Sequence, residues 1–294
     1  MKLFATLLFT TSMLFAIDPS VTPEWLSENI DKKDLVIVQV SDKTSYELEH
    51  IPNAQNSDIG AWRYDNGTFL SIKSKSDIER EISRLGIDKN SEVVLYAPIK
   101  EPRDLLKTSY IFWALDYHGI SSVALLDGGL DAWKAKNLPL TADVKVNKAT
   151  NYKATINDSK YADINYVKNA LGKLPMVDAR PAAMYLGVTP TATVERNGHI
   201  SGAMSYSWDF SVDKNYNLKS TELLDAVFKD GYNLDKNKEV LVYCTGGLET
   251  SYNYYVLKGV LGYKNVRLYD ASMKEWGNRA DTPMVQYRYE NFKN

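Results

Sequence analysis

The fold of this chain is indicated by the stretch Glu239-Val240-Leu241-Val242-Tyr243-Cys244-Thr245-Gly246-Gly247-Leu248-Glu249-Thr250. Its apolar run, residues 240–243, is short and rich in valine, as expected of a strand covered on both faces. The run ends at Cys244, the single cysteine of the chain. Two glycines permit a tight loop, and a helical pattern begins near Thr250. The stretch therefore predicts a thiol in a loop between a buried parallel strand and a helix.

The same plan occurs twice along the chain. Three segments recur in the same order, namely residues 50–54 (HIPNA) as 199–203 (HISGA), 92–96 (EVVLY) as 239–243 (EVLVY), and 127–133 (DGGLDAW) as 270–276 (DASMKEW). Each match is weak alone, but three collinear matches indicate an internal repeat. We expect two copies of one domain, at residues 17–146 and 161–294, joined by a polar linker at residues 147–160.

Short apolar runs alternate with helical patterns in both copies. Strands are predicted at residues 35–40, 93–96 and 123–126 and again at 176–177, 240–243 and 266–268, with helices at 104–117 and 250–261. Strands that alternate with helices imply right-handed crossovers and a mostly parallel sheet. We therefore expect an α/β fold with its functional site outside the carboxyl ends of the strands.

The composition is that of an ordinary globular protein. The length of 294 residues suggests two domains, and 35 basic against 37 acidic side chains provide no electrostatic footprint for nucleic acid. One cysteine and three histidines exclude an intramolecular disulfide and zinc sites with four cysteines or with two cysteines and two histidines. No metal or other cofactor is expected.

Residues 1–16 have the layout of a secretory signal peptide. Lys2 precedes an apolar run that ends at Ala16, and the run is shorter than the roughly 20 residues needed to span a bilayer. We expect export to the periplasm, cleavage after Ala16 and no stable membrane anchor. The alternative is a buried N-terminal helix.

The loop after Cys244 suits a negatively charged sulfur. The N–H groups of a curled glycine loop and of a helix N-terminus favour negative charge, so a thiolate or persulfide on Cys244 should be stabilised. In the first copy the cysteine position holds Ala97, and Pro98 and Pro102 in the following loop have no N–H to donate. The first copy is therefore expected to be inactive and to shape a cleft against the second.

The chain resembles the tandem-domain rhodaneses, which are the thiosulfate and 3-mercaptopyruvate sulfurtransferases. The resemblance rests on the cysteine loop and on residues 177–180 (VDAR), 185–187 (YLG), 198–203 (GHISGA), 269–270 (YD) and 275–276 (EW). It implies two rhodanese-like domains, each with a mostly parallel five-stranded sheet flanked by helices. It also implies that Cys244 takes a sulfane sulfur from thiosulfate, mercaptopyruvate or a polysulfide, forms a persulfide, and passes the sulfur to a thiol, cyanide or protein acceptor.

The chain departs from the thiosulfate type of this family. Members of that type carry basic residues directly after the cysteine, where this chain has Thr245 and Gly246, and many members have arginine where it has Met184. Glu249 adds a charge that opposes a dianionic donor, so the neutral loop looks more like the mercaptopyruvate type. The residues expected to bind substrate are Thr245, Gly246, Gly247, Leu248, Glu249 and Thr250.

Four further side chains have an expected role. Arg196 is a candidate contact for a carboxylate or sulfonate of the substrate, and the alternative is a solvated surface arginine. Asp178 and Arg180 follow a predicted strand and are expected to form a pair that braces the neighbouring loop. His199 has an equivalent in the first copy, which lacks the thiol, so a packing role is favoured over base catalysis.

Two other functions fit parts of the pattern. A phosphatase of the dual-specificity type uses a thiolate loop followed by an arginine that clamps phosphate, but the corresponding positions here are Thr250 and Ser251. A periplasmic sulfur carrier or binding module without turnover remains open. Steady-state turnover with a small donor distinguishes an enzyme from such a carrier.

Overall fold

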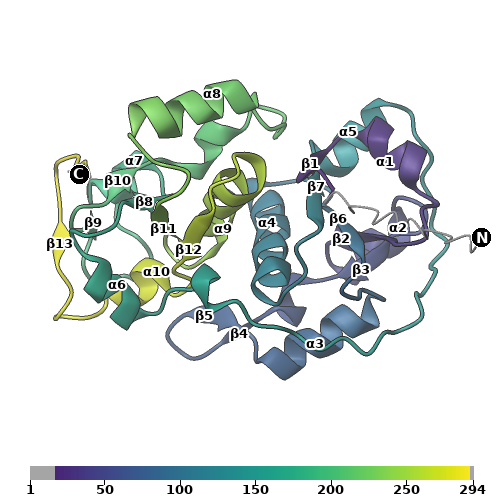
Figure 1. The fold of residues 1–294 in the computed structure, drawn as a ribbon, viewed down its shortest axis with the longest axis horizontal. Coiled ribbons are helices and arrows are strands. Elements are labelled where there is room, and N and C mark those ends of the chain that lie inside the picture. Colours follow the sequence, from purple (N-terminus) through teal and green to yellow (C-terminus); the bar gives the residue numbers. More distant parts are fainter. Residues whose placement is uncertain (1–16, 292–294) are drawn as a thin grey trace, which may run out of the picture.

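The structure, a computed structural model, describes residues 17–291. It has two α/β halves, and α4 (Pro102–Tyr117) of the first half lies beside α9 (Leu248–Tyr254) of the second at the centre of the molecule (Figure 1). The expected signal peptide, residues 1–16, lies outside the described residues. No helix among residues 17–291 is long and apolar enough to cross a membrane.

The first half is built on a parallel five-stranded sheet in the order β1-β7-β6-β2-β3. Its strands are β1 (Ser20–Val21), β2 (Leu35–Val40), β3 (Gln55–Ser57), β6 (Glu92–Tyr96) and β7 (Val123–Leu126). Around it lie α1 (Pro23–Asn29), α2 (Lys43–Leu48), α3 (Lys75–Arg84), α4 and α5 (Gly129–Ala135). An antiparallel hairpin, β4 (Arg63–Asp65) and β5 (Leu70–Ile72), reaches toward the second half (Figure 1).

The second half repeats this plan with a parallel sheet in the order β10-β8-β11-β12. Its strands are β8 (Met176–Asp178), β10 (Met204–Ser205), β11 (Glu239–Tyr243) and β12 (Asn265–Leu268). The helices are α6 (Ile164–Ala170), α7 (Ala182–Tyr185), α8 (Thr221–Asp225), α9 and α10 (Ser272–Trp276). A separate antiparallel pair joins β9 (His199–Ile200) to β13 (Met284–Val285).

The α/β class and the parallel sheets are confirmed, with one difference in strand number. The second sheet has four strands, because the place of β1 is taken by a single parallel bridge between Tyr161 and Leu268. All six predicted strands are present, two with the predicted bounds and four extended by one residue. Both helices begin two residues before the predicted start. In α4 the first turn includes Pro102, a residue that is favoured there, and α9 begins at Leu248.

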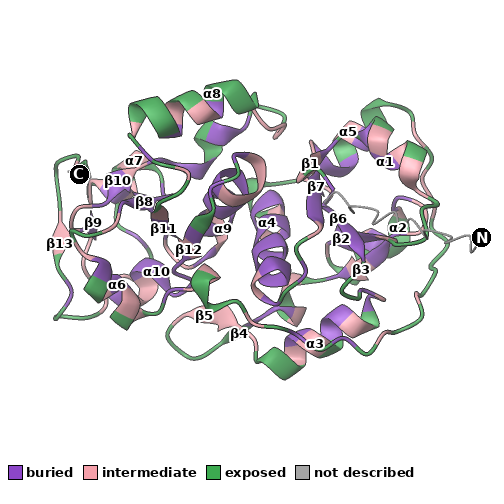
Figure 2. Ribbon diagram, in the orientation of Figure 1, coloured by how far each residue is buried: buried purple, intermediate pink, exposed green. Residues whose placement is uncertain are grey.

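The two halves share one continuous core across α4 and α9. Residues 105–116 of α4 are buried apart from Lys107, and the helix is mostly purple in Figure 2, because the first sheet packs against one side of it and α9 against another. Ser109 Oγ lies 2.8 Å from Ser251 Oγ, and the Tyr254 hydroxyl donates to Asp116 Oδ2 over 2.7 Å. Phe112 and Tyr255 meet edge to face with ring centroids 5.2 Å apart. These contacts fix the position of the first copy against the loop after β11.

The chain between the halves follows the surface of the first one. Thr150 N donates to Ser83 O over 2.9 Å, and the Tyr152 hydroxyl donates to His118 O over 2.7 Å. No helix or strand is found at residues 142–157. This segment is therefore extended, and it is held by these hydrogen bonds and by the buried side chains of Tyr152 and Ala154.

Candidate active site

Cys244 lies at the carboxyl end of β11, and two backbone N–H groups point at its sulfur. Gly246 N is 3.3 Å and Gly247 N is 3.1 Å from Sγ. The chain turns back within these three residues and continues into α9. The loop therefore forms a cradle of amide donors around the sulfur, as the two glycines predicted.

The cradle depends on the conformation of Gly247. Its φ of +93° lies in the region that favours glycine, and an added Cβ would overlap the carboxylate of Asp270. The other side of the loop is tied to the residues after β12. Cys244 N donates to Ser272 Oγ over 3.0 Å, and Lys274 N donates to Thr245 O over 2.9 Å. The loop is thus held by the segment that begins α10.

The expectation of a stabilised thiolate is wrong for the closed loop that the structure shows. Cys244 has no exposed surface, and this burial raises the pKa of its thiol to about 12, with the negative charge of Glu249 as the second cause. The neighbouring Thr250 acts in the opposite direction, toward a lower pKa, and is outweighed. The N–H donors of the loop favour a thiolate, but the loss of water on burial outweighs them, because it penalises an ion most strongly in a buried site.

The raised pKa predicts a steep dependence of thiol reactivity on pH. Because the thiol is protonated at neutral pH, the thiolate fraction rises about tenfold for each pH unit below the pKa. The alkylation rate of Cys244 by iodoacetamide, followed by intact mass, should therefore rise continuously between about pH 7 and pH 10. Glu249→Gln should shift the curve to lower pH. A plateau below about pH 9 in the wild-type protein would show that the amide donors dominate after all.

The cysteine loop forms one wall of a cleft between the two halves. The cleft has a volume of about 570 Å³ and is lined by Arg63, Leu70, Glu101, Pro102, Arg103, Leu106, Met184, Thr191, Ala192, Thr193, Trp208, Thr245, Gly246, Leu248, Glu249 and Lys274. Residues 63–106 of this set belong to the copy without a cysteine. That copy therefore shapes the cleft as expected.

Besides Arg63, two basic side chains line this cleft from outside the cysteine loop, Lys274 and Arg103. The side chain of Lys274 covers Gly246, since its Cδ lies 3.3 Å from where a Cβ on that glycine would stand. Arg103 at the start of α4 is exposed and lines the facing wall. Sequence reasoning missed both as site residues, because each is far from Cys244 along the chain.

The loop residues that were predicted to bind substrate do not all face the cleft. Thr245, Gly246, Leu248 and Glu249 line the cleft, whereas Gly247 and Thr250 face the interior. Thr250 is fully buried, and its Oγ1 has no hydrogen-bond partner. The arrangement leaves the side chains of residues 245, 248 and 249 for contact with a substrate.

The interpretation of Arg196 as a substrate contact needs correction. Its guanidinium donates to the backbone carbonyl groups of Gly277, Thr282, Trp276 and Arg279, and it is not part of the cleft wall. With its donors used in this way, Arg196 fastens the segment after α10 to the loop before β9. It is a structural side chain rather than a solvated or substrate-binding one.

Asp178 and Arg180 form a buried ion pair. Arg180 Nη2 lies 2.6 Å from Asp178 Oδ2 and also donates to Gly198 O over 2.7 Å. Asp178 is at the end of β8, next to β11, so the pair joins the strand end to the loop that precedes His199. This is the bracing arrangement that the sequence suggested.

The two equivalent histidines have the same environment in both copies. His50 stacks on Tyr46 with centroids 3.9 Å apart, and His199 stacks on Tyr185 at 3.7 Å. In each case Nδ1 lies within 2.8 Å of the carbonyl oxygen of the same tyrosine. A packing motif shared by the copy with the cysteine and the copy without it supports the structural interpretation.

An ion pair across the two halves was not found by sequence reasoning. Arg63 of β4 lies 3.4 Å from Asp270 and donates to Gly246 O over 2.6 Å. Asp270 also accepts from the Tyr110 hydroxyl over 2.9 Å. The repeat pointed to Asp270 as part of a matching segment, but no pattern in the sequence indicated Arg63.

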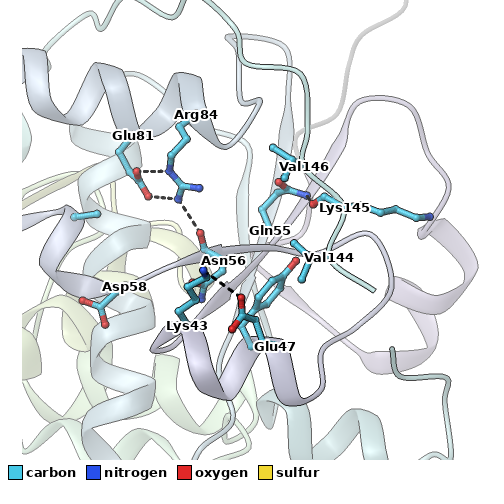
Figure 3. A pocket seen from close by; sticks show the side chains of 12 residues that line it. Lys43, Glu47, Gln55, Asn56, Asp58, Glu81, Arg84, Val144, Lys145 and Val146 are labelled. Atoms are coloured by element: carbon cyan, nitrogen blue, oxygen red, sulfur yellow. Dashed lines mark hydrogen bonds and ion pairs between the residues drawn. The ribbon is translucent and has the colours of Figure 1, made fainter. Parts of the chain in front are cut away.

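A second hollow, of about 360 Å³, lies in the first half below the segment that follows α5 (Figure 3). Four of its charged side chains form two ion pairs, Arg84 with Glu81 and Lys43 with Glu47. No Ser, Thr or Cys side chain lines it. Among residues 17–291 no group of three or more His, Cys, Asp or Glu side chains is placed to hold a metal ion.

Comparison with known proteins assigns both copies of the domain to one family. A family model for the rhodanese-like domain matches residues 22–136 and 163–279. The chain is 30% identical over 281 residues to a sulfur carrier protein, TtuD, of Thermus thermophilus, with 90% of this chain and 96% of the relative covered. It is 30% identical over 286 residues to a thiosulfate sulfurtransferase of Corynebacterium glutamicum, with 93% and 92% covered.

Solved structures show the same fold at lower identity. The crystal structure of YnjE superposes with a TM-score of 0.83 at 21% identity, over 92% of this chain and 69% of that one. The wild-type structure of EanB gives 0.81 at 20% identity, over 92% and 69%. The paired domains and the named relatives fit a sulfurtransferase. The chain belongs to the rhodanese family, with two rhodanese-like domains in tandem.

Proposed function

We propose that this protein moves a sulfane sulfur from a small donor to a thiol, cyanide or protein acceptor through a persulfide on Cys244. The observation that carries the proposal is the pair of N–H groups, of Gly246 and Gly247, aimed at Sγ from 3.3 and 3.1 Å. Such donors suit a sulfur that carries negative charge during transfer. No other nucleophilic sulfur competes, since the chain has one cysteine.

The transfer consists of two displacements at sulfur. The Cys244 thiolate attacks the outer sulfur of the donor, the bond between that sulfur and the rest of the donor breaks, and the bonding pair leaves with the remainder. The acceptor thiolate or cyanide then attacks the same sulfur, and Cys244 leaves as a thiolate. The resting thiol loses its proton before the first step. The charge of Glu249 opposes this loss, and the N–H groups of the cradle favour it.

A sulfur carrier without rapid turnover is the second candidate. The complete burial of Cys244 favours it, because a loaded sulfur would be shielded from water and from adventitious thiols. One relative is named a sulfur carrier and another a thiosulfate sulfurtransferase. Intact mass after exposure to thiosulfate, mercaptopyruvate and a polysulfide tests loading, and steady-state turnover with cyanide or a dithiol separates the two candidates. A mass unchanged by every donor contradicts both.

We further propose export to the periplasm with removal of residues 1–16. The support is the basic residue followed by a short apolar run. N-terminal sequencing of protein released by osmotic shock should begin near Ile17. Full-length protein confined to the cytosol would overturn this localisation without affecting the proposed chemistry.

A further inference from the structure

We propose that Arg63, from the copy that lacks the cysteine, is a positioning residue for the sulfur site. It acts by fixing the peptide group between Gly246 and Gly247. The proposal rests on the proposed function, because it concerns the sulfur that Cys244 would carry.

The two ends of this one peptide group have different partners. Its carbonyl oxygen, on Gly246, accepts a hydrogen bond from Arg63 Nη2 over 2.6 Å. Its N–H, on Gly247, points at Cys244 Sγ over 3.1 Å. The C=O and N–H of a planar trans peptide point in opposite directions, and none of the described peptide bonds is cis. A group that holds the carbonyl therefore also aims the N–H at the sulfur.

Arg63 is itself held firmly enough to do this. The same Nη2 donates to Leu70 O over 2.8 Å and lies 3.4 Å from Asp270 Oδ1. The guanidinium carbon stands 4.5 Å from the ring centroid of Tyr110. Asp270 Oδ2 accepts from the Tyr110 hydroxyl and from Ile72 N, each over 2.9 Å. With only 4% of its side chain exposed, Arg63 has little freedom to turn away.

The charge of Arg63 also affects the donor strength of the amide. A cation on the carbonyl oxygen polarises the peptide and makes its N–H a stronger donor, especially where water is excluded. No residue with a side chain can take the place of Gly247, because a Cβ there would overlap Asp270 and lie 3.1 Å from Arg63 Nη2. The silent copy therefore contributes more than a wall of the cleft, since it sets one of the two donors on the sulfur.

The glycine content of the chain makes this peptide directly observable. Of the 16 glycines, only Gly128-Gly129 and Gly246-Gly247 are adjacent in sequence. In protein labelled with ¹³C-carbonyl, ¹⁵N-glycine, only the amides of Gly129 and Gly247 couple to a labelled carbonyl. The Gly246 carbonyl shift then reports the bond from Arg63, the Gly247 amide shift reports the bond to sulfur, and the Gly128-Gly129 pair is an internal control.

Arg63→Met should move the Gly246 carbonyl and Gly247 amide signals upfield and leave the Gly128-Gly129 signals in place. It should also slow sulfur loading of Cys244 about tenfold at fixed pH, the loss of one charge-assisted hydrogen bond. Arg63→Lys, which retains a charged donor, should restore much of both. Where Arg63→Met does not fold, Arg63→Gln removes the charge with a smaller change and should give the same displacement.

Tyr110→Phe is the matched control. It removes a hydroxyl bound to Asp270 at the same interface but leaves the bond from Arg63 to Gly246, so both glycine signals should stay near their wild-type positions. The proposal is overturned if Arg63→Met leaves these signals unchanged, or if Tyr110→Phe moves them equally. If no donor loads the wild-type protein, the proposed function fails, and the glycine signals still decide the role of Arg63.

Discussion

Cys244→Ser abolishes both the gain of one sulfur atom and every transfer to an acceptor, which is the largest effect we expect from a single substitution. The hydroxyl fits the same buried space and can accept from the same two N–H groups. It is, however, far less acidic and less nucleophilic toward sulfur than a thiolate. Because the variant contains no thiol, intact mass after donor exposure gives an unambiguous readout.

The first copy offers a matched control for this experiment. Ala97 is buried at the position equivalent to Cys244, and its loop contains Pro98 and Pro102. The double variant Cys244→Ser with Ala97→Cys therefore has one thiol at the corresponding strand end without the amide cradle. We expect it to remain unloaded. Loading at the wild-type rate in either variant would show that the cradle around residue 244 is not the site.

Glu249→Arg should raise the use of thiosulfate, mainly by lowering KM. Glu249 lines the cleft beside Lys274 and Arg103, and its charge opposes a donor that brings two negative charges. At about 4 Å and an effective dielectric of 20, one unit charge is worth roughly 4 kcal/mol, much of which solvent screens. We therefore expect KM for thiosulfate to decrease about tenfold. The effect falls on KM rather than on kcat because the charge contacts ground and transition states alike.

The wild-type protein should accordingly prefer mercaptopyruvate, or a less charged polysulfide, over thiosulfate in kcat/KM. Glu222→Arg is a suitable control for the variant, because Glu222 lies in the first turn of α8 as Glu249 lies in the first turn of α9. It makes the same change in net charge away from the cleft. Thiosulfate as the best wild-type donor, unaffected by Glu249→Arg, would mean that Lys274, Arg103 and the amide donors already neutralise the anion.

The site differed from expectation where side chains far apart along the chain meet. Arg196 is of a residue type that binds anions, but its guanidinium donates hydrogen bonds to four backbone carbonyl groups near α10. Lys274 and Arg103 bring positive charge to a loop that has none of its own. Neither outcome follows from a local pattern, because each depends on which surfaces the folded chain brings together.

The sequence by itself determined the α/β class, the repeat and the place of the thiol. Periodic apolar runs specify buried strands, collinear segments specify two copies, and a cysteine between a strand and a glycine pair can only stand at a strand end. Only the tertiary structure decided the protonation of that thiol and the role of Arg63. The burial of Cys244 and the hydrogen bond from β4 to the loop after β11 exist only in the folded chain, where residues far apart along the sequence lose water together.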